Sequence, residues 1–297
     1  MISSLHQLTE HLAARRLRRR IAVVCGTDTS TVEAVARAVD AGYAHAVFVG
    51  DVAATRQLAD RLVDSAHADF VAADGEADAA RKAVALVRNG EADVLMKGLV
   101  GTDVLLHAVL DKTAGLLPPG QVLTHISVSE WPAYGKLLLF SDAAVIPFPT
   151  PQQRRAQVAY AAAVSRSLGV EEPRVALIHC SEKPSDKFPY TLDYAAIAAE
   201  ARDGRWGRLL VDGPLDIRTS CDAGALAVKG IESPLEGQAD VLVFPDLESG
   251  NTFYKTMTFI VGAVTAGVLC GTSRPVVLPS RGDDAVTKFY SLAMASL

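Results

Sequence analysis

Residues 279–284, in the order Pro-Ser-Arg-Gly-Asp-Asp, place next to one another side chains that can bind an anion and move a proton. Arg281 offers a planar fork of N–H donors that suits a phosphate or a developing oxyanion. Asp283 and Asp284 each offer a general base or the N-cap of a helix. Ser280 lies outside a G-x-S-x-G elbow and has no histidine nearby, which disfavours a serine nucleophile. A capped helix explains the aspartates but leaves the arginine unexplained, so we interpret this turn as the centre of the chemistry.

A second polar segment, residues 96–102, reads Met-Lys-Gly-Leu-Val-Gly-Thr. Gly98 allows the backbone to approach an anion, Lys97 adds a point charge, and Thr102 can cap the helix that follows. The order G-x-x-x-x-G-K-[ST] is absent, which excludes a P-loop. These residues therefore form either an anion cradle or an ordinary turn.

A third segment, residues 244–255, ends a strand in carboxylates and opens a helix with Gly250 and Asn251. Asn251 and Lys255 are four residues apart, so they share one helix face near the positive end of the helix dipole. A capped helix with a solvated lysine would give the same pattern, but we favour ligand binding.

A fourth segment, residues 26–28 (Gly-Thr-Asp), departs from G-x-G-x-x-G and is predicted to be a plain turn between a strand and a helix.

The elements that position these residues are apolar runs of strand length that alternate with helical patterns. Such runs, without polar alternation, are typical of a mostly parallel sheet with helices on both faces. Ligands collect at the carboxyl ends of parallel strands, which is where the polar segments fall. The predicted strands are residues 21–25, 46–49, 93–96, 122–128, 137–140, 174–179, 208–211, 240–244 and 275–278.

Three alternate prolines in residues 146–151 interrupt this series, because proline ends both strands and helices. We therefore predict two α/β lobes with a boundary near residue 148. A long helix is predicted from Asn251, and it is expected to include the uncharged residues 256–273 as a core helix rather than a membrane span.

Composition restricts the class of protein. Of the 297 residues, 49% are apolar and 21% charged, and the formal net charge is −5, which argues for a globular chain without a nucleic-acid partner. The four cysteines are scattered without zinc or disulfide spacing, which predicts reduced thiols and a cytoplasmic location. No signal peptide or membrane segment is expected.

Taken together, five segments resemble the phosphate acyltransferases, and the phosphate butyryltransferases more closely than the phosphate acetyltransferases. The resemblance extends from about residue 20 onward. The segments are Met-Lys-Gly-Leu-Val-Gly-Thr (96–102), Val-Asp-Gly-Pro-Leu-Asp (211–216), Lys-Gly-Ile-Glu-Ser-Pro (229–234), residues 239–255 with the pattern P-D-x-x-x-G-N-x-x-x-K, and residues 275–283 with the pattern S-R-x-D.

The resemblance implies transfer of a short acyl group between coenzyme A and inorganic phosphate, with no permanently bound cofactor and no metal. It also implies a fold like that of the isocitrate and isopropylmalate dehydrogenases, with the site between two lobes. In that fold residues 275–297 rejoin the first lobe, so that residues 1–148 plus 275–297 form one lobe and residues 149–274 the other. A homodimer or higher homo-oligomer is likewise implied.

Residue by residue, the resemblance implies that Ser280 and Arg281 are the family's active-site serine and arginine. Asp283 stands where the butyryltransferase-like pattern has its aspartate, although Asp284 stays open as the base. Acyl-CoA and phosphate would be bound by residues of the other segments, namely Lys97, Gly98, Thr102, His125, Gly250, Asn251 and Lys255.

In acetyltransferases the catalytic aspartate lies further along, near Thr287 here, and the sequence departs from the family's pattern at two more places. His125 stands where acetyltransferases tend to carry arginine, and residues 217–222, including Arg218, replace a short acidic stretch. These departures keep open the alternative of a non-catalytic protein that binds acyl-CoA or phosphate. The shared fold keeps open a second alternative, an NAD(P)- and metal-dependent hydroxy-acid dehydrogenase.

Overall fold

The computed structural model describes residues 1–280 and 282–297, which divide into two compact units. The first unit contains Leu5–Leu123 and Thr265–Leu297, and the second contains Met1–Ser4 and Thr124–Val264. The boundary predicted near residue 148 differs from the one at Thr124. The reason is that the hairpin after Thr124 pairs with a strand of the second unit, which carries it out of the first.

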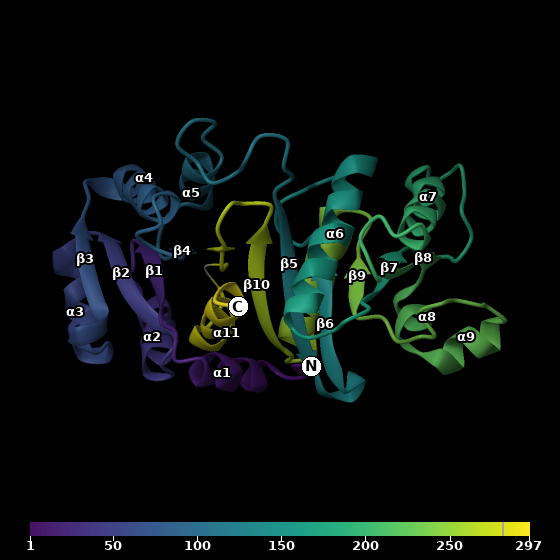
Figure 1. Cartoon of the computed structure of the whole chain (residues 1–297), viewed down its shortest axis with the longest axis horizontal. Helices are drawn as coiled ribbons and strands as arrows, with labels where there is room; N and C mark the ends of the chain where they lie inside the picture. The colour runs from purple at the N-terminus through teal and green to yellow at the C-terminus, as the bar shows by residue number, and fades with distance from the viewer. Residues whose placement is uncertain (281) are drawn as a thin grey trace. The chain divides into compact units, whose positions relative to one another are not determined.

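The first unit is built on a sheet with the strand order β3-β2-β1-β4-β11-β10 (Figure 1). All the neighbouring strands in it are parallel except β10 and β11. The prediction of a mostly parallel α/β fold is therefore confirmed. The strands are β1 (Arg19–Val24), β2 (Ala44–Gly50), β3 (Ala68–Ala72), β4 (Val94–Lys97), β10 (Val264–Cys270) and β11 (Val276–Val277).

The helices of the first unit cover both faces of this sheet. The chain winds outward from β1 to β3 and then returns to place β4 on the other side of β1. Because parallel crossovers are right-handed, this reversal puts α4 on the face opposite α2 and α3. The helices are α1 (Leu5–Ala14), α2 (Thr29–Asp40), α3 (Val52–Leu62), η1 (Ser65–His67), α4 (Gly75–Arg88), α5 (Thr102–Val109) and α11 (Ala285–Ala295).

The second unit has the strand order β5-β6-β9-β7-β8, in which only the β5–β6 hairpin is antiparallel. Its strands are β5 (Thr124–Trp131), β6 (Lys136–Ser141), β7 (Arg174–Ile178), β8 (Leu210–Leu215) and β9 (Val241–Val243). Its helices are η2 (Pro132–Tyr134), α6 (Pro151–Ser167), α7 (Tyr190–Arg202), α8 (Ile217–Cys221), α9 (Ala223–Lys229), α10 (Leu247–Lys255) and the π-helix η3 (Thr256–Ile260).

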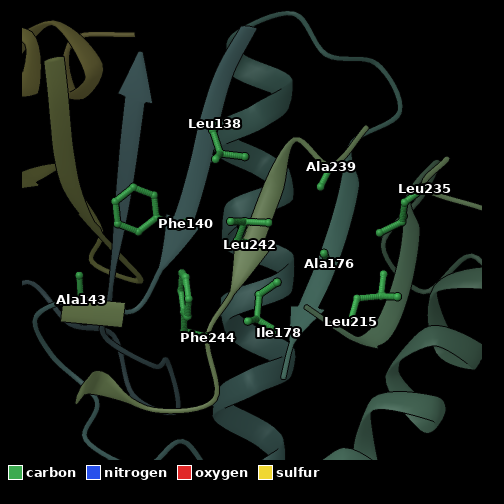
Figure 2. Close-up of a cluster of buried hydrophobic side chains, with 10 residues drawn as sticks. All are labelled: Leu138, Phe140, Ala143, Ala176, Ile178, Leu215, Leu235, Ala239, Leu242 and Phe244. Atoms are coloured by element: carbon green, nitrogen blue, oxygen red, sulfur yellow. The ribbon is translucent and has the colours of Figure 1, made fainter. Parts of the chain in front are cut away.

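One face of the second sheet carries a dense apolar core (Figure 2). Its residues alternate along the strands, as the two-residue period of a strand requires: Leu138 and Phe140 come from β6, and Ala176 and Ile178 from β7. The ring of Phe253 on α10 packs edge-on against Phe140 with their centroids 5.0 Å apart. This packing fixes α10, which carries the Gly250–Asn251 pair, onto the sheet.

The prediction of a long helix from Asn251 is wrong at both ends of that helix. Helix α10 begins at Leu247, since Asp246 accepts a hydrogen bond from the Ser249 amide as its N-cap. The chain leaves the helical path at Gly262, whose φ of +68° favours glycine, and continues as β10. β-Branched residues at 264, 265 and 268 favour that strand.

Strand β3 is absent from the sequence prediction. It lies at the edge of the first sheet and buries none of its five residues fully, so it lacks the apolar run that marks the interior strands. In the part of the chain that the structure describes, each helix is too short or too polar to cross a lipid bilayer.

Candidate active site

Three neighbouring parallel strands of the first unit end beside a cavity of about 300 Å³. These strands are β1, β4 and β11, and the cavity lies where the winding direction of the sheet reverses, between β1 and β4. Such a switch point is where ligands bind in open α/β sheets, because the loops on either side diverge. The lining residues are Asp28, Thr29, Ser30, Lys97, Gly98, Leu99, Pro279, Ser280 and Lys288.

The β4 exit loop brings Lys97 into this cavity. Lys97 is 1% exposed, and its Nζ donates to the Gly98 carbonyl at 3.3 Å. Gly98 is required because a Cβ there would lie 2.5 Å from the carbonyl oxygen of Cys25, in the adjacent β1 exit. A buried ammonium costs free energy unless anionic or polar groups face it, so its placement favours the anion cradle over an ordinary turn.

The Ser280 turn closes another side of the cavity, and its two aspartates have different contacts. The Asp283 carboxylate accepts a hydrogen bond from the Ser280 amide at 2.7 Å and so holds the turn. Asp284 is the N-cap of α11, where it accepts from the Thr287 amide at 2.8 Å. Ser280 is exposed, and Arg281 lies outside the described residues.

Residues 26–28, predicted to form a plain turn, also line the cavity through Asp28. Asp28 caps α2, as a turn residue would, by accepting from the Thr31 amide at 2.9 Å. It also accepts from Nζ of Lys288 at 3.1 Å. Burial alone would raise the pKa of Asp28, but hydrogen bonds from Thr31 and Ser30 and the charge of Lys288 lower it below its ordinary value.

Thr102 does not have the capping role expected of it. The N-cap of α5 is Gly101, whose amide donates to the Glu76 carboxylate at 2.8 Å, and Thr102 is the first helical residue. Thr102 is also not among the residues that line the cavity.

In the second unit, a buried aspartate that the sequence analysis did not identify organises the exit of β6. Asp142 is 2% exposed and accepts hydrogen bonds from five donors. The nearest are the Thr124 hydroxyl at 2.7 Å and the Ala144 amide at 2.8 Å. The others are the amides of His125, Val145 and Ile146.

Gly250 and Asn251 pack directly on this exit loop. A Cβ at Gly250 would lie 2.2 Å from the carbonyl oxygen of Asp142, which explains the glycine of the P-D-x-x-x-G-N pattern. Nδ2 of Asn251 donates to the Ala143 carbonyl at 2.9 Å. The structure therefore brings His125, Gly250 and Asn251 together around Asp142.

His125 and Lys255 differ in exposure. His125 is 7% exposed, with its Nδ1 3.3 Å from the Ser127 hydroxyl. Lys255 is exposed at the end of α10, with its Nζ 5.1 Å from the centre of the Tyr254 ring. Of these two side chains, only Lys255 presents its charge to solvent.

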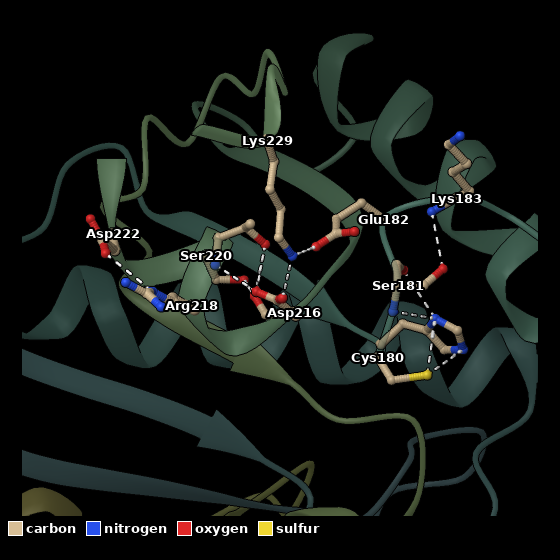
Figure 3. Close-up of polar contacts among 11 residues, drawn as sticks. Cys180, Ser181, Glu182, Lys183, Asp216, Arg218, Ser220, Asp222 and Lys229 are labelled. Atoms are coloured by element: carbon tan, nitrogen blue, oxygen red, sulfur yellow. Dashed lines mark hydrogen bonds and ion pairs between the residues drawn. The ribbon is translucent and has the colours of Figure 1, made fainter. Parts of the chain in front are cut away.

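A polar cluster lies beside the departure at residues 217–222, at the exits of β7 and β8 (Figure 3). Nζ of Lys229 lies 2.8 Å from Asp216 and 2.5 Å from Glu182. Burial pushes the pKa of Asp216 upward, but hydrogen bonds from Lys229 and Thr219 outweigh it and lower the pKa to about 2. Arg218 pairs only loosely with Asp222, at 3.5 Å on an exposed face. This cluster joins the end of α9 to the exit loops of β7 and β8 in the second unit.

The two units thus each have an α/β sheet with polar side chains at the strand ends, and the first has a cavity lined by Lys97 and Lys288 at its switch point. The family profile described as Phosphate acetyl/butaryl transferase matches residues 64–296. The phosphate butyryltransferase of Clostridium acetobutylicum is 35% identical, covering 100% of this chain and 98% of that protein. The phosphate acetyltransferase of Thermotoga maritima is 32% identical, covering 96% of each.

Solved structures agree with these sequence relatives. A branched-chain phosphotransacylase from Enterococcus faecalis V583 superposes with a TM-score of 0.82 at 30% identity, covering 93% of this chain and 97% of that one. A 4-hydroxythreonine-4-phosphate dehydrogenase from Klebsiella pneumoniae, at 12% identity and a TM-score of 0.56 over 94% of this chain and 98% of that one, shares the fold alone.

This chain belongs to the phosphate acetyl/butyryl transferase family. It is an acyltransferase that interconverts an acyl-CoA and an acyl phosphate, with coenzyme A and phosphate as the family's substrates. The family and the activity predicted from the five segments are confirmed.

Proposed function

We propose that the Ser280 turn is the reaction centre, at which a short acyl group passes between coenzyme A and inorganic phosphate. The observation that carries the proposal is the cavity that Ser280 shares with the buried Lys97 at the switch point of the first unit. An exposed hydroxyl beside a buried cation suits a reaction in which negative charge develops on an acyl oxygen.

In the direction of acyl phosphate formation, a phosphate oxygen attacks the thioester carbonyl. The C=O electrons move onto oxygen, where Arg281 stabilises the oxyanion, and the C–S bond then breaks to release the thiolate. Ser280 hydrogen-bonds the leaving sulfur. In the reverse direction, Asp283 takes the thiol proton, the thiolate attacks the carbonyl carbon of the acyl phosphate, and the C–O bond then breaks to release inorganic phosphate. General base catalysis contributes about 10²–10⁴-fold. The roles of Ser280, Arg281 and Asp283 rest on the resemblance.

The proposed roles of residues in the second unit are to position the β6 exit loop and to bind coenzyme A. Gly250 and Asn251 fix the β6 exit loop, so we assign them to positioning. The exposed ammonium of Lys255 suits a phosphate group of coenzyme A. His125 and Thr102 are assigned to the same ligand on the sequence pattern alone.

Phosphate-dependent release of free thiol from acetyl-, propionyl- and butyryl-CoA tests the reaction. We expect turnover with at least one of them, and a loss of about 10²–10³ in kcat for Ser280→Ala, as for removal of one transition-state hydrogen bond. Ser273→Ala, at an exposed serine outside the cavity, is the matched control. No thiol release from any short acyl-CoA, by protein shown to be folded, would refute the proposal.

For the acyl group, we propose butyryl or a branched chain of similar size ahead of acetyl. The support is the phosphate butyryltransferase of Clostridium acetobutylicum, which is 35% identical over the whole of this chain, together with the branched-chain phosphotransacylase structure at 30% identity. The chain-length profile of kcat/KM in the thiol-release assay decides it, and a maximum at acetyl-CoA would contradict it.

We also propose a homo-oligomer, supported by an exposed apolar surface after α10. Phe259 is 89% exposed and Ile260 74%, and Val261 and Val264 continue the surface. Contiguous exposed apolar side chains of this kind mark interaction sites, most often a two-fold interface between identical copies. Sedimentation equilibrium measures the mass, and a monomer of 31.4 kDa at micromolar concentration would contradict the proposal.

A further inference from the structure

Helix α11, which follows the Ser280 turn, carries a lysine where its buried face is otherwise small, apolar or serine. Lys288 is 4% exposed. Its Nζ donates to Ser30 Oγ at 2.7 Å, to Thr31 Oγ1 at 3.0 Å and to Asp28 Oδ1 at 3.1 Å. An ammonium has three N–H donors, so these contacts use all of them and hold the charge at a fixed position.

This fixed charge lines the same cavity as Ser280. Among the lining residues that the structure describes, Lys97 and Lys288 are cationic and Asp28 is anionic, which leaves one positive unit. The lowered pKa of Asp28 keeps its carboxylate ionised near neutral pH. Without Lys288, the same lining would be neutral.

We propose that Lys288 offsets the negative charge of Asp28 in this cavity, and that it is thereby a positioning residue that makes the cavity a subsite for the phosphate dianion. The inference rests on the proposed function, because it assumes that phosphate reacts beside Ser280. Phosphate is the substrate group that carries its full charge at the reacting atoms, whereas the thioester is neutral there. A fixed cation in a partly buried cavity therefore acts mainly on phosphate.

Three variants separate this electrostatic role from a purely structural one. Lys288→Met keeps much of the aliphatic stem and removes the charge. Asp28→Asn keeps an oxygen for the α2 cap, since asparagine is as good an N-cap as aspartate. The double variant, Asp28→Asn with Lys288→Met, loses the ion pair but restores the one positive unit of the wild type.

The readout is KM for phosphate and for the acyl-CoA in the thiol-release assay. We expect Lys288→Met to raise KM for phosphate roughly 10- to 50-fold, as for loss of a unit charge several ångströms from the ligand. KM for acyl-CoA should change much less. The double variant should return KM for phosphate to within about threefold of the wild type, since the two charge effects oppose each other.

The matched control is the exposed ion pair of Asp78 and Lys82 on α4, 2.8 Å apart and outside the cavity. Asp78→Asn with Lys82→Met should leave both KM values unchanged. If the folded double variant at positions 28 and 288 binds phosphate no better than Lys288→Met, the pair has a structural role only and the proposal is wrong.

A second measurement separates this failure from failure of the proposed function. Inorganic phosphate should raise the melting temperature of the wild type and of the double variant, and raise that of Lys288→Met much less. If the wild type shows this shift but no thiol release, the reaction is wrong and the subsite stands. Equal shifts in all three proteins would overturn the subsite.

Discussion

Replacement of Asp142 by asparagine tests how the second unit holds the loop on which Asn251 packs. The carboxylate is buried and only accepts hydrogen bonds. Oδ1 accepts from the amides of Ala144 and Val145, and Oδ2 accepts from the amides of residues 125 and 146 and from a threonine hydroxyl. An asparagine amide must place an NH₂ group at one of these two positions, where it faces at least two backbone donors.

The expected loss follows from counting these contacts. At least two hydrogen bonds to an ionised acceptor disappear, each worth about 1.5–3 kcal/mol, and the facing N–H groups stay buried without an acceptor. The threonine hydroxyl can rotate to accept, which recovers part of one contact. We therefore expect Asp142→Asn to lower the free energy of unfolding of the second unit by about 3–5 kcal/mol.

Urea unfolding followed by tryptophan fluorescence reports on this unit specifically, because both tryptophans, Trp131 and Trp206, lie in it. Asp203→Asn is the matched control, at an exposed aspartate after α7, and should change the free energy by no more than about 0.5 kcal/mol. An Asp142→Asn protein within about 1 kcal/mol of the wild type would refute the idea that the carboxylate is needed as an acceptor on both oxygens.

Two further substitutions test neighbouring features of the same unit. Gly250→Ala should destabilise it by about 2 kcal/mol in the same urea assay, although alanine is the better helix former, because the new Cβ would meet the carbonyl of Asp142. A stabilised variant would contradict this. Lys229→Met should raise the lowered pKa of Asp216, so the stability that the ion pair adds is full above about pH 4 and is lost as the pH falls toward about 2. The difference in unfolding free energy between wild type and variant, measured from about pH 7 down to pH 2, should therefore shrink on acidification, and a difference that grows would exclude this linkage.

The positions of Lys97 and Ser280 could be predicted from the sequence because they follow apolar runs. Parallel strands end at the same edge of a sheet, so polar residues after such runs converge there without any knowledge of the strand order. What the sequence could not supply was the order itself. The insertion of β11 beside β4 puts Ser280 next to Lys97, and nothing local to either segment encodes that pairing.

Other parts of the site depend on conformation that residue types do not reveal. Asp142 follows a strand as many turn aspartates do, and four of its five donors are backbone amides whose direction depends on the path of the loop. Lys288 stands on a helix where a lysine is ordinarily solvated, and only the packing of α11 against α2 buries it. Residues 256–273 contain no charged side chain, and an uncharged run of this kind is compatible with a buried helix and with a buried strand. Their mean hydropathy therefore could not distinguish a helix from a strand.

The discontinuity of the first unit has a consequence for synthesis on the ribosome. Residues 124–264 leave the ribosome as one block and can complete the second unit's sheet early, since domains fold as units during translation. The edge of β4 stays without its partner β11, and α2 stays without its packing partner α11, until residues 276–297 have emerged. The Ser280 turn lies between those two late elements. The nascent chain therefore acquires its reaction centre last, and a chain truncated before β11 would fold its second unit yet lack the cavity in which phosphate is proposed to bind.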